Sequence, residues 1–132
     1  MKKLEFVIIS FFCLISLNAC AFDVLNIKQI PAQIESPEMT KGSFQLNAEL
    51  KVDLGTGFSR TLKKGTKWDY VGTVPFGDVF KTNDQILTIE ASNIYEAYIV
   101  VSASKLVGFY LPVERTFSPL SQPEDLIIKS VQ

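Results

Sequence analysis

Residues 43–54 carry the pattern that most restricts the fold of this chain. From Phe44 onward, apolar and polar residues alternate without a break as far as Leu54. Side chains of a β-strand point alternately to its two faces, whereas a helix would scatter these apolar groups around its circumference. The pattern therefore predicts one long strand that places a single face on a core. That face would consist of Phe44, Leu46, Ala48, Leu50, Val52 and Leu54.

Shorter strand patterns, separated by turn residues, fill much of the chain after this strand. The candidates cover residues 58–62, 67–74, 85–90, 94–101 and 106–111. Strands at this spacing with turn signals between them are typical of all-β sandwiches and small barrels. We therefore expect an all-β fold, a small antiparallel barrel or sandwich of six to eight strands. The expected core includes the aromatic residues Trp68, Phe80, Tyr95 and Phe109.

The predicted hairpin formed by residues 94–101 and 106–111 is unusual because both of its faces are apolar. A core on one side explains only one of these faces, so the other must be covered. The cover is either the N-terminal lead-in, the C-terminal tail or another molecule. For the last case, the candidate partner surface consists of Ile94, Tyr98, Val100, Leu106 and Tyr110.

Charge and composition exclude several classes of function. The 132 residues include 13 basic and 14 acidic side chains, so the chain lacks the positive charge expected of a nucleic-acid-binding protein. Histidine is absent, which removes the commonest general base and the commonest metal ligand. The two cysteines, Cys13 and Cys20, both precede the predicted strands. We expect no metal, no cofactor and no disulfide within the β domain.

Candidate catalytic groups are few, and each has a simpler structural explanation. Glu96 lies among apolar residues of a predicted strand and is either solvated at an edge or partly buried with a raised pKa. Asp78 lies beside a glycine in a turn, where aspartate usually bonds the local backbone. Ser102 and Lys105 have the S-x-x-K spacing of serine–lysine acylases, but they occupy a predicted hairpin turn instead of a helix. We therefore expect a protein that is not an enzyme.

The first twenty residues have the pattern of an export signal. Lys2 and Lys3 precede an uncharged apolar run over residues 6–17, which is too short to span a bilayer. The run ends in Leu17, Asn18, Ala19 and Cys20. This ending resembles the acylation motif of bacterial lipoproteins. The resemblance implies that Cys20 is acylated and becomes the first residue, and that Ala21 directs the protein to the outer membrane.

Two alternatives to this signal remain open. Ala19 and Ala21 around Cys20 also form the small-residue site of ordinary signal cleavage, which would release a soluble periplasmic or secreted protein that begins at Phe22. The segment would otherwise stay uncut as an N-terminal anchor. A second resemblance covers residues 65–120, which look like small lipoproteins of the Gram-negative envelope with no assigned activity.

The sequence thus predicts four segments. Residues 1–19 are a lipoprotein signal peptide, 20–42 a tether and lead-in, 43–115 a β domain and 116–132 an extended C-terminal tail. A further short strand is plausible near 23–30, limited by the proline that follows it.

The expected function is that of a lipid-anchored envelope protein, a non-catalytic binding or assembly module. Its partners would be membrane lipid through acylated Cys20, and an envelope protein or a second copy of the chain. The alternative is an inhibitor that protects the cell against an incoming hydrolase, with loops 74–78 and 102–105 blocking the enzyme. The third possibility is a carboxylate-dependent hydrolase that uses Glu96.

Overall fold

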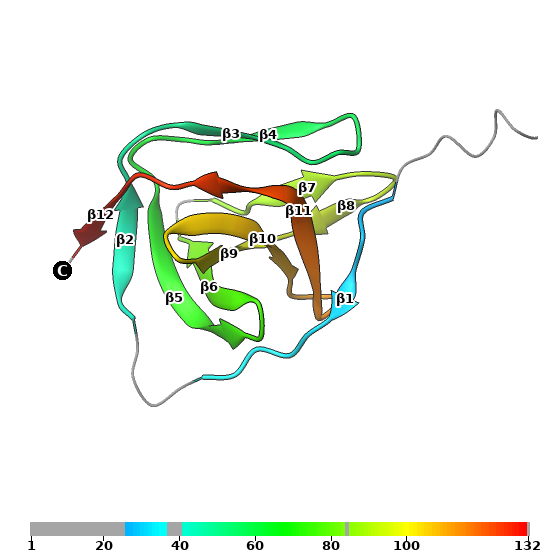
Figure 1. The fold of residues 1–132 in the computed structure, drawn as a ribbon, viewed down its shortest axis with the longest axis horizontal. Helices are drawn as coiled ribbons and strands as arrows, with labels where there is room; N and C mark the ends of the chain where they lie inside the picture. The colour runs from blue at the N-terminus through cyan, green and yellow to red at the C-terminus, as the bar shows by residue number, and fades with distance from the viewer. Residues whose placement is uncertain (1–25, 37–40, 84, 132) are drawn as a thin grey trace, which may run out of the picture.

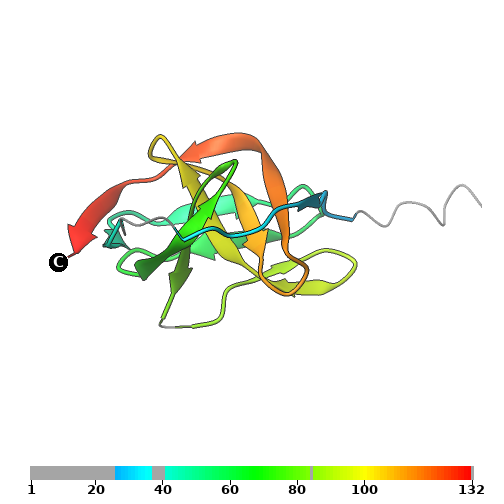
Figure 2. The same ribbon diagram turned by 90° about the horizontal axis from the view of Figure 1, so that it is seen from below.

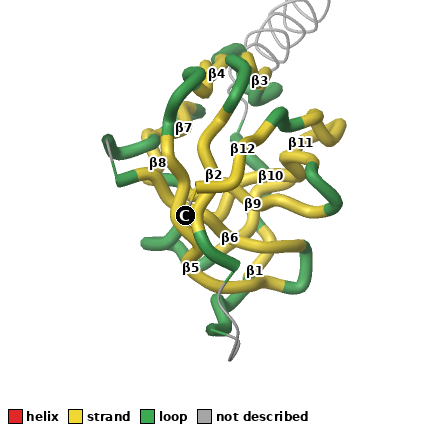
Figure 3. Tube along the Cα trace, turned by 90° about the vertical axis from the view of Figure 1, so that its left-hand side faces the viewer, coloured by secondary structure: helices red, strands yellow, loops and turns green. Residues whose placement is uncertain are grey.

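The computed structural model describes residues 26–36, 41–83 and 85–131, and all regular structure in them is β-strand. The predicted all-β fold is therefore confirmed (Figures 1 and 3). These described ranges contain no helix long and apolar enough to cross a membrane. The predicted lipidation site, Cys20, lies outside the described residues.

Twelve strands follow one another along the described chain. They are β1 (Ile30–Pro31), β2 (Ser43–Leu46), β3 (Leu50–Asp53), β4 (Ser59–Leu62), β5 (Lys67–Val74), β6 (Gly77–Thr82), β7 (Thr88–Glu90), β8 (Ile94–Glu96), β9 (Tyr98–Ser102), β10 (Lys105–Leu111), β11 (Thr116–Asp125) and β12 (Ile128–Val131). The strand predicted over 67–74 has the observed bounds of β5.

Eight of the strands form one antiparallel sheet in the order β1-β11-β10-β9-β6-β5-β2-β12. The other four form two ribbons, β3-β4 and β7-β8. The edge strands β1 and β12 do not pair with each other among the described residues, so the sheet is not a closed barrel. Of the two predicted architectures, the structure has the sandwich-like one.

The long strand predicted over residues 43–54 is divided in two, and that prediction was wrong at its centre. The amide of Asn47 donates a hydrogen bond to the carbonyl oxygen of Ile127, 2.7 Å away, and the chain then leaves the main sheet. Residues 50–53 continue as β3 and pair with β4 instead. The alternation survives the break because Phe44, Leu46 and Val52 are buried in the same core.

The first arm of the predicted hairpin, residues 94–101, is also divided. Ala97 is buried, and its amide donates a hydrogen bond to the carbonyl oxygen of Leu87, 2.9 Å away. Strand β8 therefore pairs with β7, and only β9 pairs with β10. The predicted turn is confirmed, with φ of 51° at Ala103 and 62° at Ser104. Two consecutive positive φ angles match the right-handed twist of the flanking strands.

The segment expected to be an extended tail, 116–132, instead contributes β11 and β12 to the main sheet. Its prolines suggested that it would not pair. Among the described residues, β1 pairs only with Thr116 and Phe117, so the rest of β11 is an edge strand, and an edge tolerates proline. Pro119 faces Gly108 of β10, where the ladder has an irregularity.

The main sheet has a core on each side, which accounts for the apolar hairpin. The first core contains Trp68, Ile99 and Phe109 and is covered by the two ribbons. The second core contains Val74, Val79, Val100, Tyr110 and Phe117, packed against Ile30, Ala32 and Ile34. Residues 30–35, which we call the strap, therefore cover the second face, and Figure 2 shows them crossing β9 and β10. Three expected core aromatics, Trp68, Phe80 and Phe109, are buried, while Tyr95 is half-buried against the first core.

Candidate functional site

The strap is fastened to the sheet at both ends. Near its start, the amide of Ala32 donates a hydrogen bond to the carbonyl oxygen of Arg115 at 3.1 Å, and the Tyr110 hydroxyl donates one to the carbonyl oxygen of Ala32 at 3.1 Å. At its end, Glu35 and Thr73 exchange two backbone hydrogen bonds, of 2.8 Å and 2.7 Å. The strap thus spans from β11 to β5 over the second core.

Gly72 is the residue that lets the strap approach β5. A Cβ atom on Gly72 would lie 2.6 Å from the carbonyl oxygen of Glu35 and would also overlap the Ile34 side chain. Any larger residue would therefore push the strap away. This role of Gly72 was not predicted from the sequence. The available signal was an isolated glycine inside a strand pattern, which often marks a close backbone approach.

Three of the five residues of the predicted partner surface are buried, two of them beneath the strap, so these three do not form an exposed surface. Val100 and Tyr110 are buried in the second core beneath the strap, and Leu106 is buried in the first core. Ile94 is 72 % exposed on β8, and Tyr98 is half-buried on β9. Intramolecular cover by the lead-in, one of the alternatives left open, therefore explains the apolar second face.

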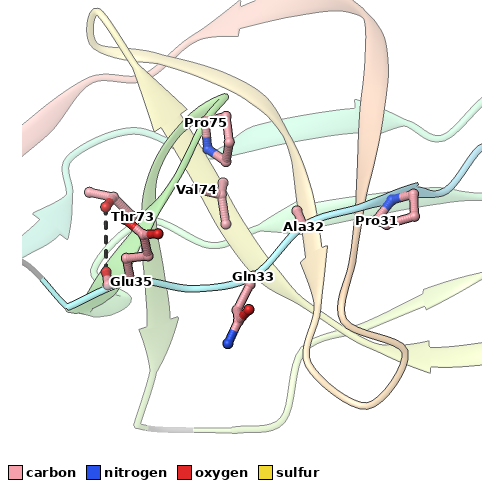
Figure 4. A pocket seen from close by; sticks show the side chains of 7 residues that line it. All are labelled: Pro31, Ala32, Gln33, Glu35, Thr73, Val74 and Pro75. Atoms are coloured by element: carbon pink, nitrogen blue, oxygen red, sulfur yellow. Dashed lines mark hydrogen bonds between the residues drawn. The ribbon is translucent and has the colours of Figure 1, made fainter.

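A pocket of about 490 Å³ lies between the strap and the β5-β6 hairpin (Figure 4). Figure 4 shows Gln33 extending from the strap on the side away from Val74 and Pro75, while Glu35 lies beside Thr73. Gln33 and Glu35 thus bring polar groups to the strap side of the pocket, Val74 and Pro75 bring apolar surface, and the Thr73 hydroxyl donates to the Glu35 carbonyl oxygen at 3.4 Å. Its walls are Pro31, Ala32, Gln33, Glu35, Thr73, Val74 and Pro75.

The two acidic residues singled out from the sequence lie apart. Asp78 pairs with Lys41 at 2.8 Å, and this hydrogen bond and charge raise the pKa of Lys41. Asp78 faces Val101 near the end of β9, whereas Glu96 precedes the start of β9, so the length of that strand separates them. A glycosidase needs two carboxylates across one cleft, and this pair does not provide them.

Glu96 has a neighbour that it affects electrostatically. Burial raises the pKa of the Tyr98 phenol, and the charges of Glu96 and Tyr110 raise it further. Glu96 and Tyr98 also line a smaller pocket of about 120 Å³ with Lys81 and Gln85. The half-buried position of Glu96 lies between the two environments expected for it, a solvated edge and a partly buried site.

Ser102 and Lys105 occupy the β9-β10 turn, as the sequence predicted. The two residues face each other across the hairpin, but the Lys105 ammonium is 3.6 Å from the Asp125 carboxylate. Both side chains are exposed. The lysine is therefore paired with an acid on β11 and is not set against the serine hydroxyl.

A polar cluster that the sequence did not indicate joins the two ribbons. Arg60 of β4 donates to the carbonyl oxygen of Thr88 at 2.5 Å and to the Thr88 hydroxyl, and it pairs with Glu90 at 3.0 Å. These bonds fix the β3-β4 ribbon against the β7-β8 ribbon. Across the described ranges, no three acidic or other metal-binding side chains come close enough together to hold a metal ion.

Comparison of the chain with protein-family models, curated proteins and solved structures gives no match. The lipoprotein resemblance therefore stays a prediction.

Proposed function

We propose that this protein is a lipid-anchored envelope protein that acts as a non-catalytic binding or assembly module. One observation carries the proposal, which is the order of segments along the chain. The uncharged run 6–17 ends in the motif Leu17 to Cys20, and the strap begins ten residues after Cys20, at Ile30. An acyl-modified Cys20 would hold the domain on the outer membrane, since two or more acyl chains bind a bilayer stably.

The absence of histidine from the sequence and the pairing of the candidate groups support a binding role over a catalytic one. Asp78 is paired with Lys41, and Lys105 is paired with Asp125. The pocket beside the strap combines hydrogen-bonding groups with apolar walls, as binding sites commonly do. We propose that its partner is another envelope protein or a second copy of the chain.

The intact mass of the protein purified from cell membranes tests this proposal. We expect a chain that begins at Cys20 and carries three acyl groups, and a Cys20→Ser variant that no longer fractionates with membranes. An unmodified chain that begins at Phe22 would contradict the proposal and would identify a soluble exported protein. Crosslinking in intact envelopes then tests the partner, with Gln33 and Glu35 as the positions for the crosslinker.

A second candidate function, inhibition of an incoming hydrolase, is favoured by one specific contact. The two loops expected to block an enzyme, 74–78 and 102–105, lie side by side because Asp78 pairs with Val101. Gly77 allows this approach, since a Cβ there would lie 2.5 Å from the carbonyl oxygen of Val101. Assays of the purified protein against lysozymes and proteases test this candidate, and it fails for every enzyme whose rate is unchanged.

A further inference from the structure

Three segments that are far apart in the sequence meet at one end of the molecule. They are the start of the described chain at Asn26, the β3-β4 turn and the β7-β8 turn, all on the right in Figure 1. The side chains of Ser92 and Asn26 share a hydrogen bond. The Thr56 hydroxyl donates to the carbonyl oxygen of Glu90 at 2.8 Å. These bonds hold the two turns together beside the point where the chain emerges.

An exposed apolar side chain lies directly after each of the two turns. Phe58, which precedes β4, is 46 % exposed, and Ile94, the first residue of β8, is 72 % exposed. Neither residue is needed to fill the first core, which is closed by Val52, Leu62 and Ile89 of the same ribbons. Isolated exposed apolar residues are ordinary on a protein surface, so their meaning depends on what lies near them.

The length of the tether decides what lies near them. Five residues separate Cys20 from Asn26. An extended chain spans at most about 3.6 Å per residue, so this tether reaches roughly 20 Å. A domain of about 100 residues has a radius of gyration of about 13 Å and is therefore wider than the tether is long. A lipid on Cys20 would therefore keep Asn26 within roughly 20 Å of the membrane surface.

We propose that this end of the domain contacts the lipid bilayer, with Phe58 and Ile94 resting in the interfacial region. This inference rests on the proposed anchoring at Cys20. The tether supplies a high effective concentration of membrane at this end, where Phe58 and Ile94 offer apolar contacts. The β12 edge would then point away from the membrane, since β12 lies at the opposite end of the longest axis (Figures 1 and 2).

Site-specific fluorescence tests the proposed orientation. No cysteine follows Cys20 in the sequence, and acylation blocks the thiol of Cys20 itself, so an introduced cysteine is the single labelling site. Three variants, Phe58→Cys, Ile94→Cys and Ile128→Cys, carry an environment-sensitive dye in the full acylated protein. The variants are reconstituted into vesicles of phosphatidylethanolamine and phosphatidylglycerol that contain a spin-labelled lipid as quencher. Ile128 is the matched control because it is an apolar residue 41 % exposed on β12.

We expect the quencher to reduce fluorescence at positions 58 and 94 and to leave position 128 unchanged. Equal quenching at all three positions, or stronger quenching at 128, would overturn the inference while the anchoring stands. A protein that carries no acyl groups and does not float with the vesicles would overturn the anchoring itself, and the orientation with it. Circular dichroism of each labelled variant confirms that the exposed substitution leaves the fold intact.

Discussion

The Tyr110 hydroxyl donates a hydrogen bond to the carbonyl oxygen of Ala32, 3.1 Å away and 78 positions earlier in the chain. This bond joins the first half of the strap to the β10 strand beneath it. Tyr110 is buried, and its ring belongs to the second core. The same residue thus supplies packing to the covered face and a polar contact to its cover.

Tyr110→Phe tests the contribution of this bond. The substitution keeps the ring and leaves the Ala32 carbonyl without its side-chain donor, so we expect the free energy of unfolding to fall by about 1 kcal/mol. Amide hydrogen exchange should quicken at Ala32 and Glu35 before it changes in β9. Tyr95→Phe is the control, since Tyr95 packs on the first core, whereas the strap packs on the second. Equal losses of stability in both variants would show that the bond between Tyr110 and Ala32 does not stabilise the strap.

Gly72→Ala tests the close approach of the strap to β5. The added Cβ overlaps the Glu35 carbonyl, so we expect a loss of about 1–3 kcal/mol in the free energy of unfolding, typical of an overpacked site. Thr73→Ala is the matched control because it removes only a side-chain contact of 3.4 Å to Glu35. Denaturant titrations of both variants check the prediction. A Gly72→Ala protein as stable as the wild type would show that the strap can move away from β5 without loss of stability.

The raised pKa of Tyr98 predicts a dependence of stability on alkaline pH. Since the folded state holds the phenol proton more tightly than the unfolded chain, this contribution is complete below the ordinary value of 10.0 and is lost as pH rises through the folded pKa. We expect the free energy of unfolding to decline above that pH, and Tyr98→Phe to flatten the decline. The raised pKa of Lys41 acts in the same direction.

The contribution of Lys41 is separated by a second variant. Asp78→Asn removes the partner that raises the Lys41 pKa and leaves the phenol in place. We expect the free energy of unfolding to decline least with rising pH when Tyr98→Phe and Asp78→Asn are combined. If the free energy of unfolding of Tyr98→Phe declines with pH as steeply as that of the wild type, the Tyr98 phenol does not cause the decline.

Arg60→Met tests the polar cluster between the ribbons. The substitution keeps an apolar stem but leaves the Thr88 carbonyl and the Glu90 carboxylate without their shared donor. We expect the free energy of unfolding to fall by about 1–2 kcal/mol, the usual range for a lost charged hydrogen bond with partial exposure. Lys51→Met, on the exposed face of β3, is the control. If Lys51→Met lowers the free energy of unfolding as much as Arg60→Met does, the polar cluster is not the cause of the loss.

The parts of the fold that follow local patterns were predicted correctly from the sequence. The class, the bounds of β5 and the β9-β10 turn depend on alternation and turn residues, which are local. The breaks at Asn47 and Ala97 depend on hydrogen bonds to Ile127 and Leu87, and no spacing rule shows such partners. The prolines of β11 were misread because only the finished sheet shows that this strand lies at an edge.

The candidate site was predicted only in part for the same reason. The two apolar faces of the hairpin correctly indicated that a second cover was required. They did not identify it, because the strap has only three inward apolar residues, Ile30, Ala32 and Ile34, and pairs with β11 through two residues. The pocket beside the strap depends on Gly72, whose importance appears only when Glu35 lies against it.

The position of the strap gives the domain a defined response to mechanical load. Tension applied through Asn26 reaches the two-residue pairing with β11 before it reaches any long strand. The next bonds in line are those that Ala32 makes with Arg115 and Tyr110, and the pair between Glu35 and Thr73 follows them. Pulling on this end therefore first withdraws Ile27 from the first core and then peels the strap from the second core. The segment nearest the anchor is thus the part of the domain that detaches first under load.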